Sequence, residues 1–343
     1  MEVRMRKLIT FIVVVLFLLI FTGLSFAGGS KEATNGEIGG TITLYTSETL
    51  TDVQKIAEKF EQKYPGTKVE IYRSGTVEVT AKLQAEIEAN SIKPDVIWFA
   101  DMAMFQDLGN KGLLLKTDLP EAMNIPKKFV YMGGKAYEAR LIYQIVAYNT
   151  EKVKKKITGW NDLLDPVFKG KVGSASAFYS GATLTQVATL SKDSKFGWDF
   201  YKKLAENDCK IVKGNGAVAR NIATGEYYIG ITIDFMARAL KAKGSPVDYV
   251  YQKEGTVYIP TPIGIISKSK NPETAKAFVN FVLSKDGQQV MVDRGYLPLN
   301  KNVPLPEGVP SPAKIKILKT DWKYLKENRD MLRKKWGEIM GVM

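Results

Sequence analysis

The stretch Phe178-Tyr179-Ser180-Gly181-Ala182-Thr183-Leu184 is the most informative part of the chain. It follows a short segment, residues 172–177, and leads into an apolar run with helical spacing through Leu184, Val187 and Ala188. Small residues at a strand-to-helix junction leave backbone N–H groups uncovered at the helix start, where the helix dipole also favours negative charge. The stretch therefore predicts an anion-binding site. An ordinary serine N-cap without a ligand is the alternative.

Strands and helices alternate on both sides of this stretch. Before it, strands are predicted at 42–45, 69–72 and 95–99, with helices around 53–60 and 74–87. After it, the same alternation gives further strands and helices at 196–205, 211–212, 215–223 and 228–233. This order is typical of open sheets flanked by helices, so the predicted fold class is α/β.

The long extended segment Leu141 to Tyr148 is predicted to cross from one half to the other, and residues 255–266 lead back. We therefore expect two lobes with a ligand cleft between them, which closes by hinge motion. Lobe 1 is predicted to comprise 41–138 and 258–301, and lobe 2 to comprise 139–257 and 302–343.

The composition limits the possible functions of the 343-residue chain, which is long enough for two medium domains. The net charge is +13, but the lysines are spread along the chain without an arginine-rich run, which argues against nucleic acid as a partner. The chain has no histidine and one cysteine, Cys209. Ser-His and Cys-His catalysis, zinc sites built on these residues and internal disulfides are therefore excluded. Cys209 is expected to be a small buried residue.

Residues 1–27 are predicted to be a signal peptide. Three basic residues precede an apolar run from Leu8 to Phe21, and Ser25-Phe26-Ala27 offers a cleavage site before a polar linker, residues 28–40. No cysteine stands near this site for lipid attachment. The mature protein is then extracytoplasmic, in the periplasm where the cell has one. An uncleaved membrane anchor is the alternative.

Polar residues that follow predicted strands are the candidate ligand contacts, because ligands gather at the carboxyl ends of strands in such sheets. Asn215 is added because it is predicted to begin a helix facing the same cleft as Ser180. Two aspartates that end strands are candidates for an ammonium group or a metal ion, with solvated loop positions as the alternative. The predicted ligand-binding residues are Thr46, Ser47, Ser74, Gly75, Thr76, Asp101, Ser180, Gly181, Ala182, Asn215 and Asp234.

Three other interpretations have weaker support. Residues 214–219 match a dinucleotide fingerprint, but the preceding strand is very short and an export signal is present. Tyr227 and Tyr228 are phenolate candidates for a trivalent metal, together with Asp101 and Asp234, although adjacent tyrosines more often straddle a strand. A glycosidase with two carboxylates has no further support, and the chain has no Walker motif or nucleophile elbow.

Taken in order, several short motifs resemble the extracellular solute-binding proteins of ABC importers, over roughly residues 41 to 300. The branch they look most like is the ferric-ion-binding-protein-like group, which includes receptors for phosphonates and sugar phosphates. The motifs are Thr43–Thr46, Ser74–Glu78, Pro94–Val96, Ser180–Ala182, Gly225–Glu226, Gly230–Asp234, Asn271–Lys276 and Leu283–Gln288.

The resemblance implies a two-lobed periplasmic-binding fold of type II. It also implies that Ser180, Ala182 and Asn215 form an anion site, since they match the family's anion-binding positions. Ferric members carry two consecutive tyrosines where this chain has Asp234-Phe235. The histidine of some members is also missing, with Thr49 close to its place, and their glutamate falls near Ala100-Asp101.

We therefore expect a monomeric, non-enzymatic receptor without a cofactor, which delivers a small phosphorylated or phosphonate solute to ABC permease subunits. In this hypothesis, Asp101 and Asp234 recognise an amine or hydroxyl group of that solute. The alternative is a ferric-ion-binding protein that holds Fe³⁺ with phosphate or carbonate.

Overall fold

The computed structural model describes residues 37–342, so the predicted signal peptide lies outside the described residues. Within residues 37–342, no helix combines the length and the hydropathy needed to cross a bilayer.

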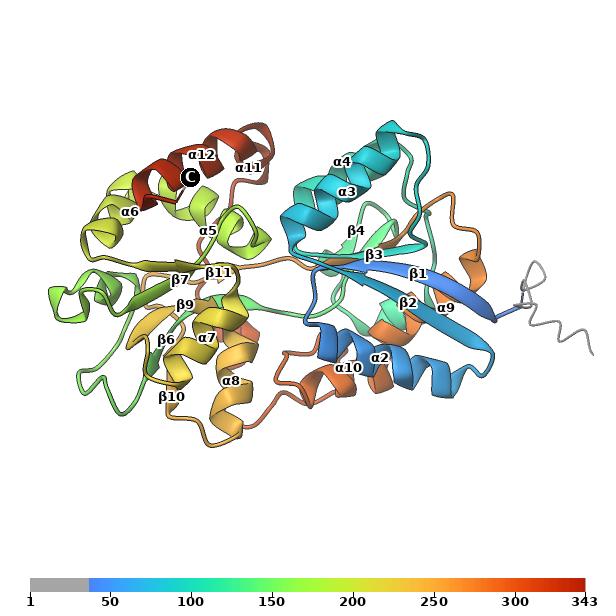
Figure 1. Cartoon of the computed structure of the whole chain (residues 1–343). Coiled ribbons are helices and arrows are strands. Elements are labelled where there is room, and N and C mark those ends of the chain that lie inside the picture. Colours follow the sequence, from blue (N-terminus) through green and yellow to red (C-terminus); the bar gives the residue numbers. More distant parts are fainter. Residues whose placement is uncertain (1–36, 343) are drawn as a thin grey trace, which may run out of the picture. The chain divides into compact units, whose positions relative to one another are not determined.

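The first lobe contains a mixed sheet of strand order β2-β1-β3-β12-β5-β4 (Figure 1). Its strands β1 to β3 are parallel, whereas β12, β5 and β4 pair in antiparallel fashion. Strand β12 comes from far along the chain, so the lobe is built from two chain segments. The strands are β1 (Gly40–Thr46), β2 (Thr67–Arg73), β3 (Val96–Trp98), β4 (Val130–Tyr131), β5 (Ala136–Glu138) and β12 (Pro262–Ile265).

Helices cover both faces of this sheet (Figure 1). One face carries α3 (Thr76–Glu88) and α4 (Met102–Asn110), and the other carries α2 (Leu50–Lys63), α9 (Pro272–Leu283) and α10 (Lys285–Val292). The ring of Phe60 in α2 packs edge-on against Phe278 in α9, with centroids 5.2 Å apart. Short 3-10 turns, Pro120–Asn124 and Lys127–Phe129, lie in the connection before β4.

The second lobe contains a mixed sheet of order β10-β6-β9-β7-β8, with β11 also paired to β6. Strand β7 is parallel to β8 and β9, and β6 is antiparallel to β9, β10 and β11. The strands are β6 (Tyr143–Asn149), β7 (Val172–Ala175), β8 (Lys210–Val212), β9 (Ile229–Ile233), β10 (Val247–Val250) and β11 (Val257–Tyr258).

Helices also flank the second sheet on both faces (Figure 1). The C-terminal helices, α11 and α12, lie with α5 and α6, while α7 and α8 cover the opposite face. The helices are α5 (Gly181–Lys192), α6 (Gly197–Glu206), α7 (Asn215–Ala223), α8 (Asp234–Ala242), α11 (Trp322–Glu327) and α12 (Arg329–Met340), with 3-10 turns at Trp160–Leu164, Pro166–Phe168 and Pro312–Lys314.

Glu138 forms hydrogen bonds that connect the two chain segments that cross between the lobes. It lies at the end of β5, and its fully buried carboxylate accepts hydrogen bonds from Tyr131 (2.7 Å) and Tyr258 (2.6 Å). The backbone N–H and hydroxyl of Thr261 donate to its other oxygen at 2.7 and 3.0 Å. Burial raises the pKa of Glu138 to about 7 against these hydrogen bonds, which favour the charged form.

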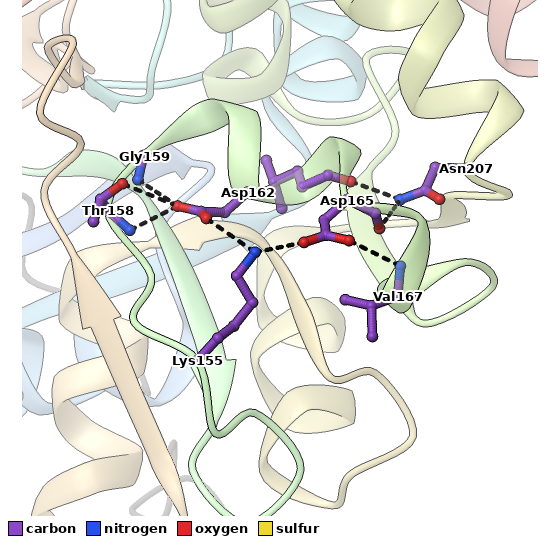
Figure 2. Close-up of polar contacts among 8 residues, drawn as sticks. Lys155, Thr158, Gly159, Asp162, Asp165, Val167 and Asn207 are labelled. Carbon is purple, nitrogen blue, oxygen red and sulfur yellow. Dashed lines mark hydrogen bonds and ion pairs between the residues drawn. The ribbon is translucent and has the colours of Figure 1, made fainter.

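A polar cluster fixes the connection between β6 and β7 (Figure 2). Asp162 accepts hydrogen bonds from the N–H groups of Thr158 and Gly159, at 2.7 and 2.9 Å. Lys155 bridges Asp162 and Asp165, whose carboxylates lie 3.7 and 2.5 Å from its Nζ. Asn207 donates from the end of α6 to the carbonyls of Leu163 (2.9 Å) and Asp165. The cluster therefore anchors this connection to the second lobe.

The predicted α/β fold with two helix-flanked sheets is confirmed. The sequence also predicts a helical tail from Ile315 to Met343, and its start is wrong, because the tail becomes helical only at Trp322. Strand β4 lies in residues 119–134, where the sequence shows only a segment punctuated by proline and glycine. The exact limits of the lobes stay a prediction. Cys209 is buried as expected, and burial raises the pKa of its thiol above the usual range.

Candidate functional site

The N-terminal ends of several helices meet at one cavity of about 330 Å³. Among the described residues, the N-caps of α2, α3, α5, α7 and α8 all line it. These N-caps are Thr49, Gly75, Ser180, Gly214 and Ile233. Each helix start presents N–H groups without an intrahelical acceptor and the positive end of its dipole. The cavity is therefore suited to an anion.

Ser180 and Asn215 form the polar centre of this cavity. The Ser180 hydroxyl oxygen accepts the N–H of Thr183 at 3.2 Å, so it is the N-cap of α5, and it accepts the Asn215 side-chain amide at 2.9 Å. Thr232 holds the Asn215 backbone carbonyl from β9, with its hydroxyl at 2.9 Å. The side-chain oxygen of Asn215 has no partner among the described residues, although Asn215 is only 8% exposed. Ser180 therefore caps α5 and also lines the cavity.

Three arginines among the described residues line the cavity, and the sequence prediction missed all of them. Arg73 ends β2 and donates to the Glu48 carbonyl (2.8 Å) and to the Tyr179 hydroxyl (3.0 Å). Because Tyr179 precedes α5, the second contact joins the two lobes. Arg220 lies on α7 and has no ion-pair partner within residues 37–342. The position of Arg73, directly before Ser74 at a predicted strand end, was the available signal.

Arg140 lies on the cavity floor in a buried ion pair with Glu48. Its guanidinium stands over the rings of Tyr296 and Trp98, 4.2 and 5.3 Å from their centroids. Burial raises the pKa of Glu48, and Arg140 opposes that shift. Burial alone lowers the pKa of Arg140, but the charge and hydrogen bond of Glu48, together with Tyr296 and Asp52, outweigh it and leave that pKa raised. Glu48 is the one carboxylate among the described lining residues, and it is committed to Arg140.

The structure brings about half of the predicted residues to the cavity. Those that line it are Ser47, Gly75, Thr76, Ser180, Ala182 and Asn215. Thr46 is buried beside it and accepts the N–H of Glu48 at 3.0 Å, whereas Ser74 donates to Glu78. Gly181 lies against the Ala100 carbonyl, where a Cβ atom would be 2.4 Å away.

The two predicted aspartates do not line the cavity. Asp101 caps α4 through the N–H of Met104 (2.9 Å) and forms an ion pair with Arg329. Asp234 is fully buried, where it accepts hydrogen bonds from Arg238 (2.8 Å) and the Tyr251 hydroxyl. Both carboxylates are occupied by protein partners, so this placement does not fit the predicted role in binding an amine or hydroxyl group.

The alternative metal ligands also lie elsewhere. The Tyr227 ring is buried against Gly173, where a Cβ atom would approach it to 2.2 Å. Tyr228 is half-buried beneath Lys171, and neither tyrosine lines the cavity. Within the part of the chain that the structure describes, no three His, Cys, Asp or Glu residues are grouped to hold a metal ion. Residues 214–219 form the start of α7, after a β8 strand of only three residues.

Residues 55–317 match the family described as bacterial extracellular solute-binding protein. The chain belongs to this family. As a solute-binding protein, it binds a small solute as part of an ABC transporter, and the family is one of binding proteins rather than enzymes. This confirms the family predicted from the sequence motifs.

Three similar proteins illustrate the range of the family. An uncharacterized protein of Haemophilus influenzae is 28% identical, with 93% of this chain and 94% of the relative covered. Iron uptake protein A1 of Synechocystis is 25% identical, with 82% and 84% covered. The solved structure of the periplasmic binding protein AfuA from Actinobacillus pleuropneumoniae, with exogenous fructose-6-phosphate bound, is 28% identical and has a TM-score of 0.79. That match covers 88% of this chain and 99% of AfuA.

Proposed function

We propose that this solute-binding protein captures a small phosphorylated or phosphonate solute and delivers it to an ABC permease. The observation that carries the proposal is the meeting of five helix N-termini, counted among the described residues, at a cavity that also contains Ser180 and Asn215. Oriented N–H groups and a favourable helix dipole bind phosphate without needing a full counter-charge. The phosphate group lies at the starts of α3, α5 and α7 in this proposal.

Asn215 supplies a donor that can respond to the ligand. The two ends of an amide side chain are distinguished only by their hydrogen bonds. With its amide turned over, Asn215 would accept the Ser180 hydroxyl and place its NH₂ group where the unpartnered oxygen now lies. Ser180 would still accept the N–H of Thr183. An anion in the cavity would favour this orientation, because the unpartnered atom becomes a donor instead of an oxygen.

The ferric alternative has less support from the cavity's side chains. Fe³⁺ sites of the predicted kind need several phenolates or carboxylates. Among the described lining residues, Glu48 is paired with Arg140, and Tyr179 accepts a hydrogen bond from Arg73. Three arginines at the same cavity favour an anion over a cation. The fructose-6-phosphate bound to AfuA, which is 28% identical, supports the same choice.

Native mass spectrometry of the purified protein, under gentle and denaturing conditions, tests the proposal by weighing any bound solute. A phosphorus-containing organic molecule is the expected result, and iron with a small anion would overturn it. A calorimetric titration with an identified phosphate ester then compares Asn215→Leu with Asn221→Leu, a change on the same helix outside the cavity. We expect the first variant alone to lose binding, and unchanged affinity in that variant would contradict the site assignment.

A further inference from the structure

A second cavity, of about 820 Å³, adjoins the first. Arg220, Phe235 and Met236 line both cavities. The space around the proposed phosphate site therefore continues past these side chains, and the part of the solute that extends beyond the phosphate meets Arg220 at the junction.

The charges around this junction are unbalanced. In the first cavity the carboxylate of Glu48 neutralises Arg140, which leaves Arg73 and Arg220 without a carboxylate among the described residues. In the second cavity both other arginines are matched, since Arg294 lies 2.6 Å from Asp52 and Arg238 lies 2.8 Å from Asp234, while Lys243, Asp293 and Glu307 line this cavity without an ion pair among the described residues. Arg220 lies five positions beyond Asn215 on α7, and its Nη1 is 3.4 Å from the place that a Cβ atom of residue 216 would take, so the guanidinium lies against the first turn of α7, beside the proposed phosphate site.

The charges that line the two cavities distinguish three kinds of solute. An amine at the junction would need a carboxylate there, but none of the described residues that line both cavities carries one, and Glu48 in the first cavity is already paired. A neutral polyol would leave the guanidinium of Arg220 without an anion. A carboxylate or a second phosphate would match it, because a guanidinium binds either group through two parallel hydrogen bonds.

We propose that the solute carries a second anionic group, separated from its phosphate by a short carbon chain, and that Arg220 binds this group at the junction of the two cavities. This inference rests on the proposed function, because it assumes that the phosphate lies at the helix starts. Arg73, at the end of β2, contributes to the same positive potential. Arg220 acts here as the residue that determines specificity.

Two probes of the same length separate the second anion from the phosphate. Glycerol 3-phosphate ends in a hydroxymethyl group, and 3-phosphoglycerate has a carboxylate in its place. Isothermal titration of the full protein is expected to give an affinity about tenfold higher for 3-phosphoglycerate, the factor that corresponds to one charge-assisted contact. Inorganic phosphate, as a third probe, measures the phosphate site alone.

Arg220→Gln removes the guanidinium from an exposed position that has no protein ion pair. We expect it to lower the affinity for 3-phosphoglycerate about tenfold and to leave that for glycerol 3-phosphate within about twofold. Lys203→Gln is the matched control, because it removes one charge from the exposed side of α6, outside both cavities. The control is expected to bind both probes as the unchanged protein does.

The outcomes separate the two proposals. Equal affinity for the two esters, or equal weakening of both by Arg220→Gln, would overturn the second anionic group and leave the phosphate site intact. If neither ester nor inorganic phosphate binds, the proposed function itself fails. A preference for 3-phosphoglycerate that Lys203→Gln also abolishes would point to overall charge, and it would likewise overturn the role of Arg220.

Discussion

Arg329 in α12 forms a two-pronged ion pair with Asp101, the N-cap of α4, with one Nη···Oδ distance of 2.8 Å. Helix α12 packs on α5 and α6 of the second lobe, whereas α4 belongs to the first. A second ion pair, with 3.1 Å between Lys326 Nζ and Asp107 Oδ1, joins α11 to α4. The C-terminal helices are therefore joined to both lobes on one side of the cleft.

Replacing Arg329 with Gln should favour separation of the lobes. The pair is largely buried, so its loss leaves the Asp101 carboxylate without its counter-charge. The ion pair joins the two lobes, so it stabilises the closed conformation relative to the open one by its own free energy. We expect solute dissociation to become about five to ten times faster without it. Stopped-flow release of the identified solute measures this rate. Lys326→Gln, at a more exposed pair, should change it little, and equal effects of the two variants would contradict the assigned role.

Glu138 should make stability depend on pH. Its pKa is raised to about 7 in the folded protein, so the folded state holds a proton that the unfolded chain releases at about pH 4.5. The stabilisation from this proton is complete below the unfolded pKa and is lost as the pH rises through 7. The loss amounts to about 3 kcal/mol. Urea unfolding at pH 5 and pH 8 should show a smaller difference in Glu138→Gln, and an identical difference would refute the shift.

Asn207 should be more important for stability than the ion pairs beside it (Figure 2). Its side chain is buried and donates to the carbonyls of Leu163 and Asp165. Asn207→Ala leaves both acceptors without this donor and should lower the free energy of unfolding by about 1–3 kcal/mol. Lys155→Ala removes two partly exposed ion pairs and should cost less than about 1 kcal/mol. Chemical denaturation ranks the two variants, and the reverse order would contradict this interpretation.

Glu48 is expected to compensate the charge of Arg140 rather than bind the solute. Glu48→Gln leaves a buried guanidinium without its partner, which should lower the free energy of unfolding by about 3–5 kcal/mol. A bound anion should restore part of that loss, so the increase in melting temperature with saturating solute should be larger than in the unchanged protein. Glu58→Gln, at an exposed pair with Lys55, is the control for the loss of one carboxylate. No added stabilisation by the solute would argue against an anion near Arg140.

Much of the fold could be predicted because local signals mark its elements. The limits of α7 agree with the prediction, since Asn215 is a strong helix-start residue. The strands β4 and β5 were missed because they are two and three residues long and lie in a segment rich in turn residues. Strand β4 pairs with β5, and β5 joins the sheet through β12, which comes more than a hundred residues later.

The site was only partly predictable, for a different reason. Ser180 and Asn215 carry local signals as helix-start residues, and they lie in contact. The roles of Asp101 and Asp234 depend on partners, and Arg329 is 228 positions from Asp101. Arg238 is only four positions from Asp234 on α8, a helical ion-pair spacing that was visible in the sequence. Arginines scattered along a chain reveal a common site only after folding.

The Trp98 ring beneath the Arg140 guanidinium provides the protein with its own optical reporter. The indole is almost completely buried, and the charge above it belongs to the floor of the cavity. A solute that brings negative charge to that floor alters the electric field across the ring, and therefore its emission. Capture can then be followed by intrinsic fluorescence without a label, and loss of the signal in Trp98→Phe assigns it to this side chain.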